Sequence, residues 1–329
     1  MANGIAKIQH YVPQFLLRNF AFGKKHRVHV FDKHFDRVFV SNVKNIACES
    51  RYYDFELDGH DLTIEPALGE IESSVKPIIA GILGSDTLRE LSPEDFGTLS
   101  VFLAIQLIRT PSLRNQIRQI PALMEQRLRG MVERENQLAH ASEYFEIPSE
   151  NEIKMMIASG SKDWSEEIAK QFIVKSWLLV STPPGKSFHI GDNPLAMNNS
   201  VKQTFYGNAG PSAPGIEIYF PLSPTRALLL LCSSHHLALQ NLVSEMKRFR
   251  WRRRRKTNCQ KFEYASEMLV ALQSGDSFVF TPDNVLHFNA LQVFNSERYI
   301  FSSTEDFRFV KSIIKNHPKA RFGRRITVN

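Results

Sequence analysis

The sequence predicts an α+β protein, with a helical middle region and small antiparallel sheets near the N-terminus and in the C-terminal half. Residues 26–31 and 36–40 alternate apolar and polar side chains on either side of a short polar turn, which is the pattern of a β-hairpin. From residue 64 to residue 179 the apolar side chains recur mostly at helical spacing. Short apolar runs typical of strands return after a Pro-Pro-Gly break at residues 183–185, so β structure is expected on both sides of the helices.

The composition predicts a large buried core. Of the 329 residues, 43% are hydrophobic and 24 are Phe. We expect a single α+β domain over residues 1–329, with a soft division near residues 181–186 as the alternative. No apolar run approaches the ~20 residues that a membrane-spanning helix needs, and no charged-then-apolar leader opens the chain. The three cysteines show no paired spacing, so we expect a cytoplasmic protein without disulfides, a cysteine zinc site or a membrane span.

The chain opens with a predicted turn and short helix. Pro13 has no backbone N–H to donate, so it suits the first turn of a helix. If the helix begins near Val12, then Phe15, Leu16 and Phe20 form one apolar face. The opening helix is therefore expected to be amphipathic.

Strands and then helices follow in the N-terminal half. Residues 51–56 are predicted to add a third strand after the hairpin, and residues 64–83 to form a helix. Ser92 and Pro93 are a strong helix start, because Ser caps the first turn and Pro fits the first helical position. We expect that helix to stop before the next proline and the helical pattern to resume as far as residue 144.

The second half is predicted to change from helices to strands and back. Two more helices are expected over residues 149–158 and 164–179, and a loop rich in Gly, Pro, Ser and Asn over residues 198–215. The expected strands cover residues 188–190, 216–222 and 226–232. The last hundred residues return to helices, one of them opened by Thr281.

Polar side chains of the opening segment are candidates for a site. Gln14 and Arg18 lie four residues apart and share a helix face, with His10 just before it. Gln and Arg can orient an anion or an amide, and the histidine proton moves readily near neutral pH. His10 and Gln14 are therefore candidate catalytic residues. The structural alternative is that His10 caps the helix under neighbouring loops while Arg18 is solvated.

A second polar group lies at the end of a predicted apolar helix. Gln106 and Arg109 follow the apolar residues 102–105, and a buried amide there must find a hydrogen-bond partner. Gln106 is either a core side chain that bonds a nearby loop such as the opening segment, or it shares one pocket with Arg109 and His10. The sequence leaves both interpretations open.

Two carboxylates are candidates for a metal site. Asp192 lies in a Gly-Asp-Asn-Pro turn after a predicted strand, and Glu217 lies on the next strand. A carboxylate at a strand end suits a Mg²⁺ or Mn²⁺ ligand or a general base, so Asp192 and Glu217 are predicted metal ligands and catalytic residues. Many metal-dependent nucleases have Glu-x-Lys at this point, but Tyr219 stands where the Lys would be. The alternative is a structural turn in which Asp192 accepts backbone hydrogen bonds.

Several common catalytic motifs are absent. Gly185-Lys186-Ser187 lacks the Gly that a phosphate-binding loop requires five residues earlier, where Val180 stands. The chain has no HExxH, no GxSxG and no Gly-rich dinucleotide fingerprint. The sequence thus argues against the enzyme classes that depend on these motifs.

The strongest indication of a partner is the basic run, residues 247–256, which reads Lys-Arg-Phe-Arg-Trp-Arg-Arg-Arg-Arg-Lys. It holds eight cations, and subtracting eight from the net charge of +7 leaves −1 for the rest of the chain. Such a run binds phosphates through charge and counterion release, while its aromatic residues stack on unpaired bases. The alternatives are another acidic partner, a membrane surface or a solvated segment without a ligand. The expected nucleic-acid-binding residues are Arg248, Arg250, Trp251, Arg252, Arg253, Arg254, Arg255 and Lys256.

Several short motifs of this chain also resemble those of a known protein family. His-Tyr-Val-Pro-Gln-Phe at residues 10–15 is similar to the start of a bacterial family known as domain of unknown function 4238. Further pieces follow in the family's order: Asn45-Ile46-Ala47, Tyr52-Tyr53, Gln106-Leu107-Ile108-Arg109-Thr110-Pro111, Gly191-Asp192-Asn193-Pro194, Pro221-Leu222-Ser223-Pro224 and Arg298-Tyr299-Ile300-Phe301. The resemblance covers roughly residues 8–303. It implies candidate positions but no activity, and Gly191 stands where the usual family form has Ser.

The sequence therefore predicts a protein directed at DNA or RNA, and specifically a metal-dependent hydrolase that cleaves a phosphodiester. The basic run would hold the backbone, Asp192 and Glu217 would bind the metal, and His10 would act as acid or base. The alternative is a non-catalytic nucleic-acid-binding or sensor module whose polar motifs are structural. The two hypotheses differ in whether His10, Asp192 and Glu217 lie within ~8 Å of one another around a cleft.

Overall fold

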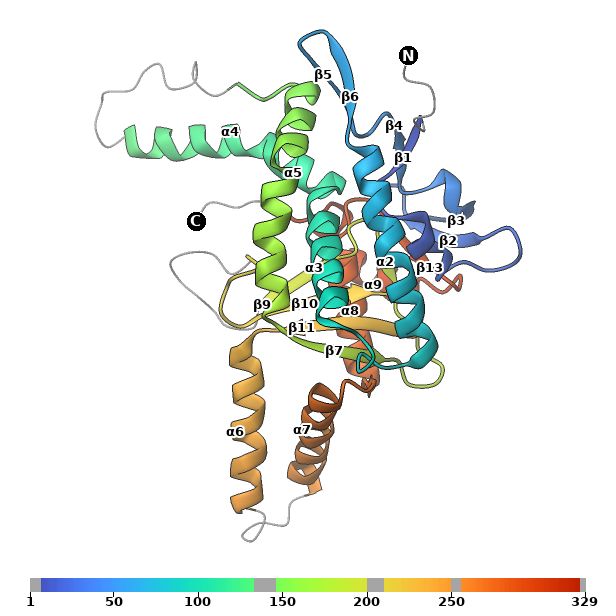
Figure 1. Cartoon of the computed structure of the whole chain (residues 1–329), viewed down its shortest axis with the longest axis vertical. Coiled ribbons are helices and arrows are strands. Elements are labelled where there is room, and N and C mark those ends of the chain that lie inside the picture. The colour runs from blue at the N-terminus through green and yellow to red at the C-terminus, as the bar shows by residue number, and fades with distance from the viewer. Residues whose placement is uncertain (1–6, 133–145, 200–209, 250–255, 326–329) are drawn as a thin grey trace.

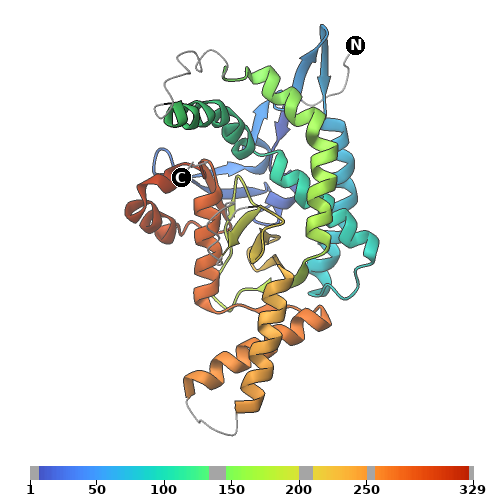
Figure 2. The ribbon, with the colours of Figure 1, turned by 90° about the vertical axis from the view of Figure 1, so that its left-hand side faces the viewer.

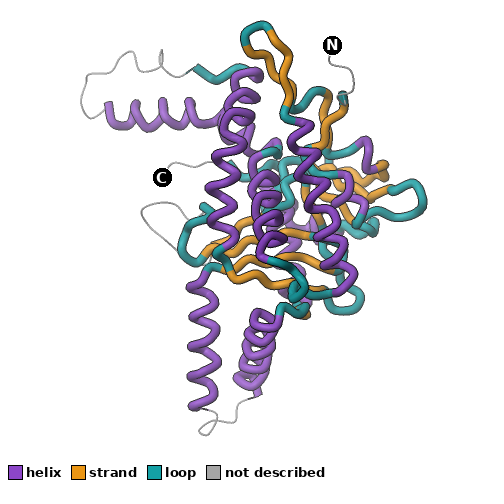
Figure 3. The backbone as a smooth tube through the Cα atoms, in the orientation of Figure 1, coloured by secondary structure: helices purple, strands orange, loops and turns teal. Residues whose placement is uncertain are grey.

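The computed structural model has the mixed α+β architecture that the sequence predicts (Figure 1, Figure 3). It describes residues 7–132, 146–199, 210–249 and 256–325. Helices form the middle of the chain, and antiparallel strands lie before and after them. The expected fold class is confirmed.

A five-stranded sheet forms the centre of the molecule. Its strands, in spatial order, are β12 (Phe278–Val279), β7 (Ser176–Ser181), β11 (Arg226–Leu231), β10 (Ile216–Pro221) and β9 (Ala196–Asn199). Neighbouring strands are antiparallel except for β12 and β7, which run parallel. Two of these strands confirm the predictions for residues 216–222 and 226–232, whereas the loop expected from residue 198 begins instead with the end of β9.

Both faces of this sheet are buried, which explains the continuous run of leucines on β11. Leu228 and Leu230 belong to the main hydrophobic cluster, while Leu229 and Leu231 belong to a second cluster on the opposite face. Successive strand residues face opposite sides, so a strand covered on both sides needs apolar residues throughout. Figure 2 shows the sheet between two helical layers. The first layer contains α2 (Glu65–Ser85), α3 (Pro93–Ile108) and α5 (Glu150–Ile173), and the second contains α8 (Pro282–Asn295).

A four-stranded antiparallel sheet joins the two ends of the chain. Its order is β3 (Arg37–Asn42), β2 (Arg27–Asp32), β13 (Tyr299–Ser302) and β8 (Ile190–Gly191). The β2–β3 pair is the predicted hairpin. Ile300 on β13 lies opposite Phe31 on one side and Gly191 on the other, so a late strand completes an early sheet. The strand expected over residues 188–190 starts only at Ile190.

Two short ladders correct the third strand predicted over residues 51–56. β1 (Ile8–His10) pairs with β4 (Cys48–Ser50), and β5 (Asp54–Leu57) pairs with β6 (His60–Thr63). A turn separates β4 from β5, with Arg51 in the left-handed region at φ 51°. The single strand predicted there was wrong because a run of β-forming residues does not reveal a turn built on one positive-φ residue.

The helix α3 of the first layer begins where its capping residue Ser92 predicts. The Ser92 side chain accepts a hydrogen bond from the Asp95 backbone N–H, and the Asp95 carboxylate accepts from the Ser92 backbone in return. A break at Pro111 then starts α4 (Pro111–Val132), and residues 133–145, to which the predicted helix extends, lie outside the described residues. None of the described helices is by itself long and apolar enough to cross a membrane, although α3 and Pro111–Arg127, bent by 51°, pass that test as a pair.

One helix replaces the two predicted over residues 149–158 and 164–179. α5 runs through Gly160 without a break, because the Trp164 ring packs where a Cβ of residue 160 would lie. The helix ends at Ile173, and the apolar run beyond it forms β7. The period of the apolar residues cannot distinguish a short buried strand from a buried helical turn. Residues 176–181 form a strand because they pair with β11.

The last part of the chain holds a helical hairpin and a C-terminal helix pair. α6 (Ser233–Phe249) and α7 (Lys256–Ser274) contact each other and extend away from the body (Figure 1, Figure 2). α8 is capped by Thr281, as expected. It is followed by β13, α9 (Arg308–Asn316) and the 3₁₀ turn η3 (Pro318–Arg321), which contacts α8.

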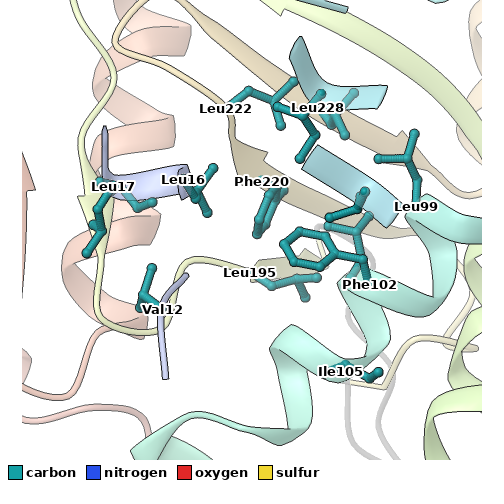
Figure 4. Close-up of a cluster of buried hydrophobic side chains, with 14 of the residues drawn as sticks. Val12, Leu16, Leu17, Leu99, Phe102, Ile105, Leu195, Phe220, Leu222 and Leu228 are labelled. Atoms are coloured by element: carbon teal, nitrogen blue, oxygen red, sulfur yellow. The ribbon is translucent and has the colours of Figure 1, made fainter. Parts of the chain in front are cut away.

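The main hydrophobic cluster draws residues from both halves of the chain. Leu16 of α1 (Gln14–Arg18), Phe102 of α3 and Phe220 of β10 are all buried within it (Figure 4). The rings of Phe102 and Phe220 meet edge to face with their centroids 5.9 Å apart. The segments before and after residues 181–186 therefore share one apolar core.

Candidate functional site

The opening segment is tied to the turn before β5 by a buried amide. Gln9 is fully buried, its Nε2 donates to Asp54 Oδ1 at 2.6 Å, and its Oε1 accepts from the Tyr53 backbone N–H at 2.6 Å. The Tyr53 hydroxyl donates in turn to the His10 carbonyl oxygen at 3.0 Å. Gln9 thus fixes the position of the segment that carries His10.

His10, Gln14 and Arg18 share one face, as the sequence predicts. The Arg18 guanidinium donates to Gln14 Oε1 at 3.2 Å, and Gln14 Nε2 lies 3.5 Å from His10 Nδ1. His10 Nε2 lies 3.2 Å from the Lys44 carbonyl oxygen, which can only accept, so the neutral ring carries its proton on Nε2. Burial lowers the pKa of His10, despite backbone hydrogen bonds that raise it. His10 is therefore neutral at pH 7, and its ring is fixed by contacts with the Lys44 carbonyl oxygen and Gln14.

Gln106 joins the helical layer to the opening segment. It is fully buried, and its Nε2 donates to the Tyr11 carbonyl oxygen at 2.8 Å. Arg109 Nε donates to Gln106 Oε1 at 3.0 Å, and its Nη1 donates to Glu72 at 2.8 Å. This is the arrangement in which Gln106 is a core amide bonded to the opening segment.

A small cavity lies beside Arg109. It is lined by Tyr52, Tyr53, Ile64, Arg109, Arg114, Lys154 and Ile157, and its volume is about 10 Å³. Neither His10 nor Gln106 lines it. Arg109 Nη2 and the Tyr52 hydroxyl are buried without a hydrogen-bond partner among the described residues. A volume of this size holds about one water molecule and is too small for an organic substrate.

Asp192 is a buried acceptor of backbone hydrogen bonds. Its Oδ1 accepts from Glu297 N at 2.7 Å, and its Oδ2 accepts from Arg298 N at 2.7 Å and Tyr299 N at 2.8 Å. The residue is 1% exposed, and burial raises its pKa to about 6, although nearby Lys33 and the three N–H donors lower it. Three consecutive amides from the start of β13 thus occupy both carboxylate oxygens.

Lys33 is the buried cation near this carboxylate. It is fully buried, and its Nζ donates to three carbonyl oxygens: those of Val293 at 2.8 Å, Ser296 at 2.5 Å and Ala320 at 2.8 Å. Burial lowers the pKa of Lys33 to about 8, while the charge of Asp192 raises it. An ammonium group with all three protons bonded fixes the end of α8 and the turn η3 to the β2–β3 hairpin.

The Gly-Asp-Asn-Pro turn forms hydrogen bonds with α8 and with Thr110. Thr110 Oγ1 donates to Asn193 Oδ1 at 3.2 Å, and Asn295 Nδ2 donates to the Asn193 carbonyl oxygen at 2.7 Å. At Gly191 an added Cβ would lie 2.9 Å from Ser296 Cβ, and the Gly191 N–H donates to Gln292 Oε1 at 3.0 Å. Close packing against Ser296, at the end of α8, therefore leaves no room for a Cβ at position 191.

Glu217 lies on the five-stranded sheet and has its own partners. Its Oε2 accepts from Tyr219 at 2.9 Å and from Asn198 at 3.1 Å, and its Oε1 lies 3.7 Å from His235 Nε2. In the same region Cys232 opens α6. Although burial alone would raise its pKa, hydrogen bonds from Ser234 and the backbone lower it to about 7.

The predicted metal and catalytic residues occupy three different sheets. His10 lies on β1, Asp192 follows β8 in the four-stranded sheet, and Glu217 lies on β10 in the five-stranded sheet. Across the residues that the structure describes, no group of three or more His, Cys, Asp or Glu side chains is arranged to hold a metal ion. The geometry thus brings His10 to Gln14 and Gln106 to Arg109, and it gives Asp192 and Glu217 separate sets of hydrogen-bond donors.

The basic run covers the end of α6, the start of α7 and the sequence between them. Lys247 and Arg248 belong to the end of α6, and Lys256 begins α7. Arg250, Trp251, Arg252, Arg253, Arg254 and Arg255 lie outside the described residues, and so do the side chains of residues 246–261.

Comparison with known proteins identifies the family. The model of the family described as "Protein of unknown function (DUF4238)" matches residues 8–306, so the chain belongs to it. No curated protein and no solved structure gives a significant match. The match spans all the polar contacts described above that join β1, α3, the Gly-Asp-Asn-Pro turn and β13.

Proposed function

For this member of a family without an assigned activity, we propose binding of nucleic acid, without cleavage, through the tip of the α6–α7 hairpin. The observation that carries the proposal is the position of the charge along the fold. Because α6 ends at Phe249 and α7 begins at Lys256, the basic run spans the part of the sequence that connects these two helices. Figure 1 shows the two helices extending from one end of the body.

The base of the hairpin is firmly attached to the body. His236 Nδ1 and Ser176 Oγ lie 2.9 Å apart, which joins α6 to β7, and the Tyr264 hydroxyl donates to Asn284 at 3.0 Å, which joins α7 to α8. Val243 of α6 and Ala265 of α7 are also buried, although neither belongs to the clusters of the body. These contacts attach both helices of the hairpin to the body.

Charge and aromatic content together favour nucleic acid as the partner. Lys and Arg that neutralise phosphates release condensed counterions, which supplies most of the affinity in binding without sequence preference. Phe249 and Trp251 lie among the cations, and aromatic rings stack on any unpaired base. The rest of the chain carries a net charge of −1, so binding is expected to depend on this one segment.

The hydrolase hypothesis has no such support. Asp192 already accepts three backbone hydrogen bonds. Glu217 lies in a different sheet from Asp192, and it accepts two hydrogen bonds from side chains of its own sheet. Cleavage of a phosphodiester with a divalent metal needs carboxylates that converge on one ion. Phosphodiester hydrolysis remains an untested prediction, and the binding module is the function that the geometry favours.

The test replaces Arg252, Arg253, Arg254 and Arg255 with Ser and measures binding by fluorescence anisotropy. The probes are single-stranded DNA, single-stranded RNA and duplex DNA of mixed sequence at low salt. We expect the variant to bind roughly 100-fold or more weakly, because several phosphate contacts together contribute orders of magnitude in affinity. The thermal midpoint should stay within about one degree, since substitutions on a charged surface cost little stability.

A matched control removes the same charge elsewhere. It carries Ser at four exposed lysines: Lys24, Lys25, Lys76 and Lys186. The control should bind nearly as well as the wild type, whereas an equal loss in both variants would mean that only net charge matters. Absence of binding by the wild type at low salt would refute the proposal. Tighter binding to vesicles that contain phosphatidylserine than to any nucleic acid would replace it with the membrane alternative.

A further inference from the structure

A second concentration of cations lies at the C-terminal end of the described chain. Residues 307–325 contain seven Lys and Arg and no Asp or Glu. Three of these cations are paired: Arg308 with Asp306, Arg321 with Asp36 and Arg325 with Glu297. Four have no ion pair among the described residues, namely Lys311, Lys315, Lys319 and Arg324. Partial desolvation lowers the pKa of Arg324, and no carboxylate raises it.

Two of these unpaired cations line a cavity with aromatic walls. The cavity has a volume of about 780 Å³, and its lining includes Phe294, His317, Lys319, Phe322, Arg324 and Arg325. Its lining contains no Asp or Glu. The cavity is open to solvent, so a ligand bound there would be partly exposed. The cavity therefore combines space, positive charge and aromatic surface.

The walls of the cavity are held in place by buried contacts. Arg325 Nη1 lies 3.0 Å from both carboxylate oxygens of Glu297, which is only 6% exposed and also accepts from Asn115 at 3.0 Å. Gly323 packs so closely on Glu297 that a Cβ would collide with it. Arg321 donates to the Lys33 carbonyl oxygen at 2.8 Å. The negative charge of Glu297 is thus matched by Arg325, which leaves Lys319 and Arg324 to meet a ligand.

The aromatic groups offer a surface for a flat ring. Phe322 is 49% exposed although it is a large apolar side chain, and it packs beside His34 with a centroid distance of 5.0 Å. The His317 ring meets Phe294 edge-on at 5.6 Å. Aromatic rings beside unpaired cations are what a nucleobase joined to a phosphate needs, because the ring stacks while the cations bind the anion.

We propose that this cavity binds one nucleoside phosphate unit, with the base against Phe322 and the phosphate at Lys319 and Arg324. The unit is either a free mononucleotide or one nucleotide of a strand, since both present the same chemistry. The site is separate from the α6–α7 hairpin, because α8 runs between them: Pro282 follows β12 near α7, whereas Phe294 lies at the other end of the helix.

The test is isothermal titration of the full-length protein with AMP, adenosine and inorganic phosphate. AMP should bind at least ~10-fold more tightly than adenosine or phosphate, because it alone presents both groups. Phe322→Ala and the double variant Lys319→Ala with Arg324→Ala should each weaken AMP binding ~10-fold or more. The matched control is Lys311→Ala with Lys315→Ala, which removes two exposed cations of α9 outside the cavity and should change binding less than twofold.

Binding of a short single-stranded oligoadenylate is compared with binding of AMP, to distinguish a strand from a free mononucleotide. If it binds much more tightly than AMP and loses affinity in the cavity variants, the occupant is a strand; equal affinity assigns a mononucleotide. Phosphate binding as tight as AMP binding, or no effect of Phe322→Ala, would overturn the proposal, as would failure of both AMP and the oligonucleotide to bind. The Ser variant of Arg252–255 should leave AMP binding unchanged, so failure at the hairpin and failure at the cavity are distinguishable.

Discussion

Replacing Asp192 with Asn separates the structural role of this carboxylate from a role in metal binding. The native Oδ1 accepts one backbone N–H and Oδ2 accepts two. Asn keeps a single oxygen, so its amide NH₂ must face at least one of these buried donors. An unpaired buried N–H costs ~1–3 kcal/mol, and Lys33 also loses a nearby negative charge. The neutral Asn also removes the cost of burying a charge, which offsets part of this loss; we expect a net loss of about 1–3 kcal/mol in the free energy of unfolding, and a larger loss for Asp192→Ala.

The assay is thermal unfolding of the wild type and the variants with and without millimolar Mg²⁺ or Mn²⁺. For a chain of this length the expected loss lowers the midpoint by roughly 2–5 °C. Asp61→Asn is the matched control, because it makes the same chemical change at an exposed residue of β6 and should shift the midpoint by less than about 1 °C. A midpoint for Asp192→Asn equal to or above that of the wild type would refute the structural role. A metal-dependent rise in the wild type that the variant lacks would restore the metal site.

Two further predictions concern pH. Burial lowers the pKa of His189 to about 4. The neutral His189 ring therefore contributes its full stability above the ordinary pKa of 6.5, and this contribution is lost as pH falls toward 4. Between pH 7 and pH 4.5 the free energy of unfolding, measured with urea, should fall by roughly 2–3 kcal/mol less in His189→Phe than in the wild type. Burial and the charge of Glu72 raise the pKa of Glu65 to about 7, so its contribution to stability is present below its ordinary pKa of 4.5 and lost as pH rises through 7. Glu65→Gln should therefore raise the thermal midpoint relative to the wild type at pH 8 but not at pH 4.5; the same shift at both values would contradict this cause.

Local signals predicted much of the fold. The hairpin of β2 and β3 follows from alternation, and the starts of α3 and α8 follow from Ser92 and Thr281 as capping residues. The errors came where tertiary contacts decide. α5 continues through Gly160 because Trp164 covers it, and the apolar residues after Ile173 form a central strand because other strands pair with them.

The candidate site was also predictable only where local signals determine the contacts. Helical spacing placed His10 beside Gln14, and the need to satisfy a buried amide indicated that Gln106 could bond the opening segment. Nothing local shows that Lys33 is buried, because it lies in a polar turn and its three acceptors come from residues 260 or more positions later. The donors to Asp192 lie 105 to 107 positions later in the sequence, so the turn chemistry that suggested a local hydrogen bond missed the actual partners.

The most direct test of nucleic-acid binding by the hairpin is the salt dependence of that binding. The affinity for a single-stranded oligonucleotide is measured from low to moderate salt for the wild type and for the variant with Ser at residues 252–255. Each phosphate contact to a single strand contributes a slope of about 0.7 in a plot of log affinity against log salt. Loss of four contacts should therefore make the slope shallower by up to ~3, whereas the exposed-lysine control keeps the wild-type slope. Equal slopes for wild type and hairpin variant would contradict binding through the hairpin.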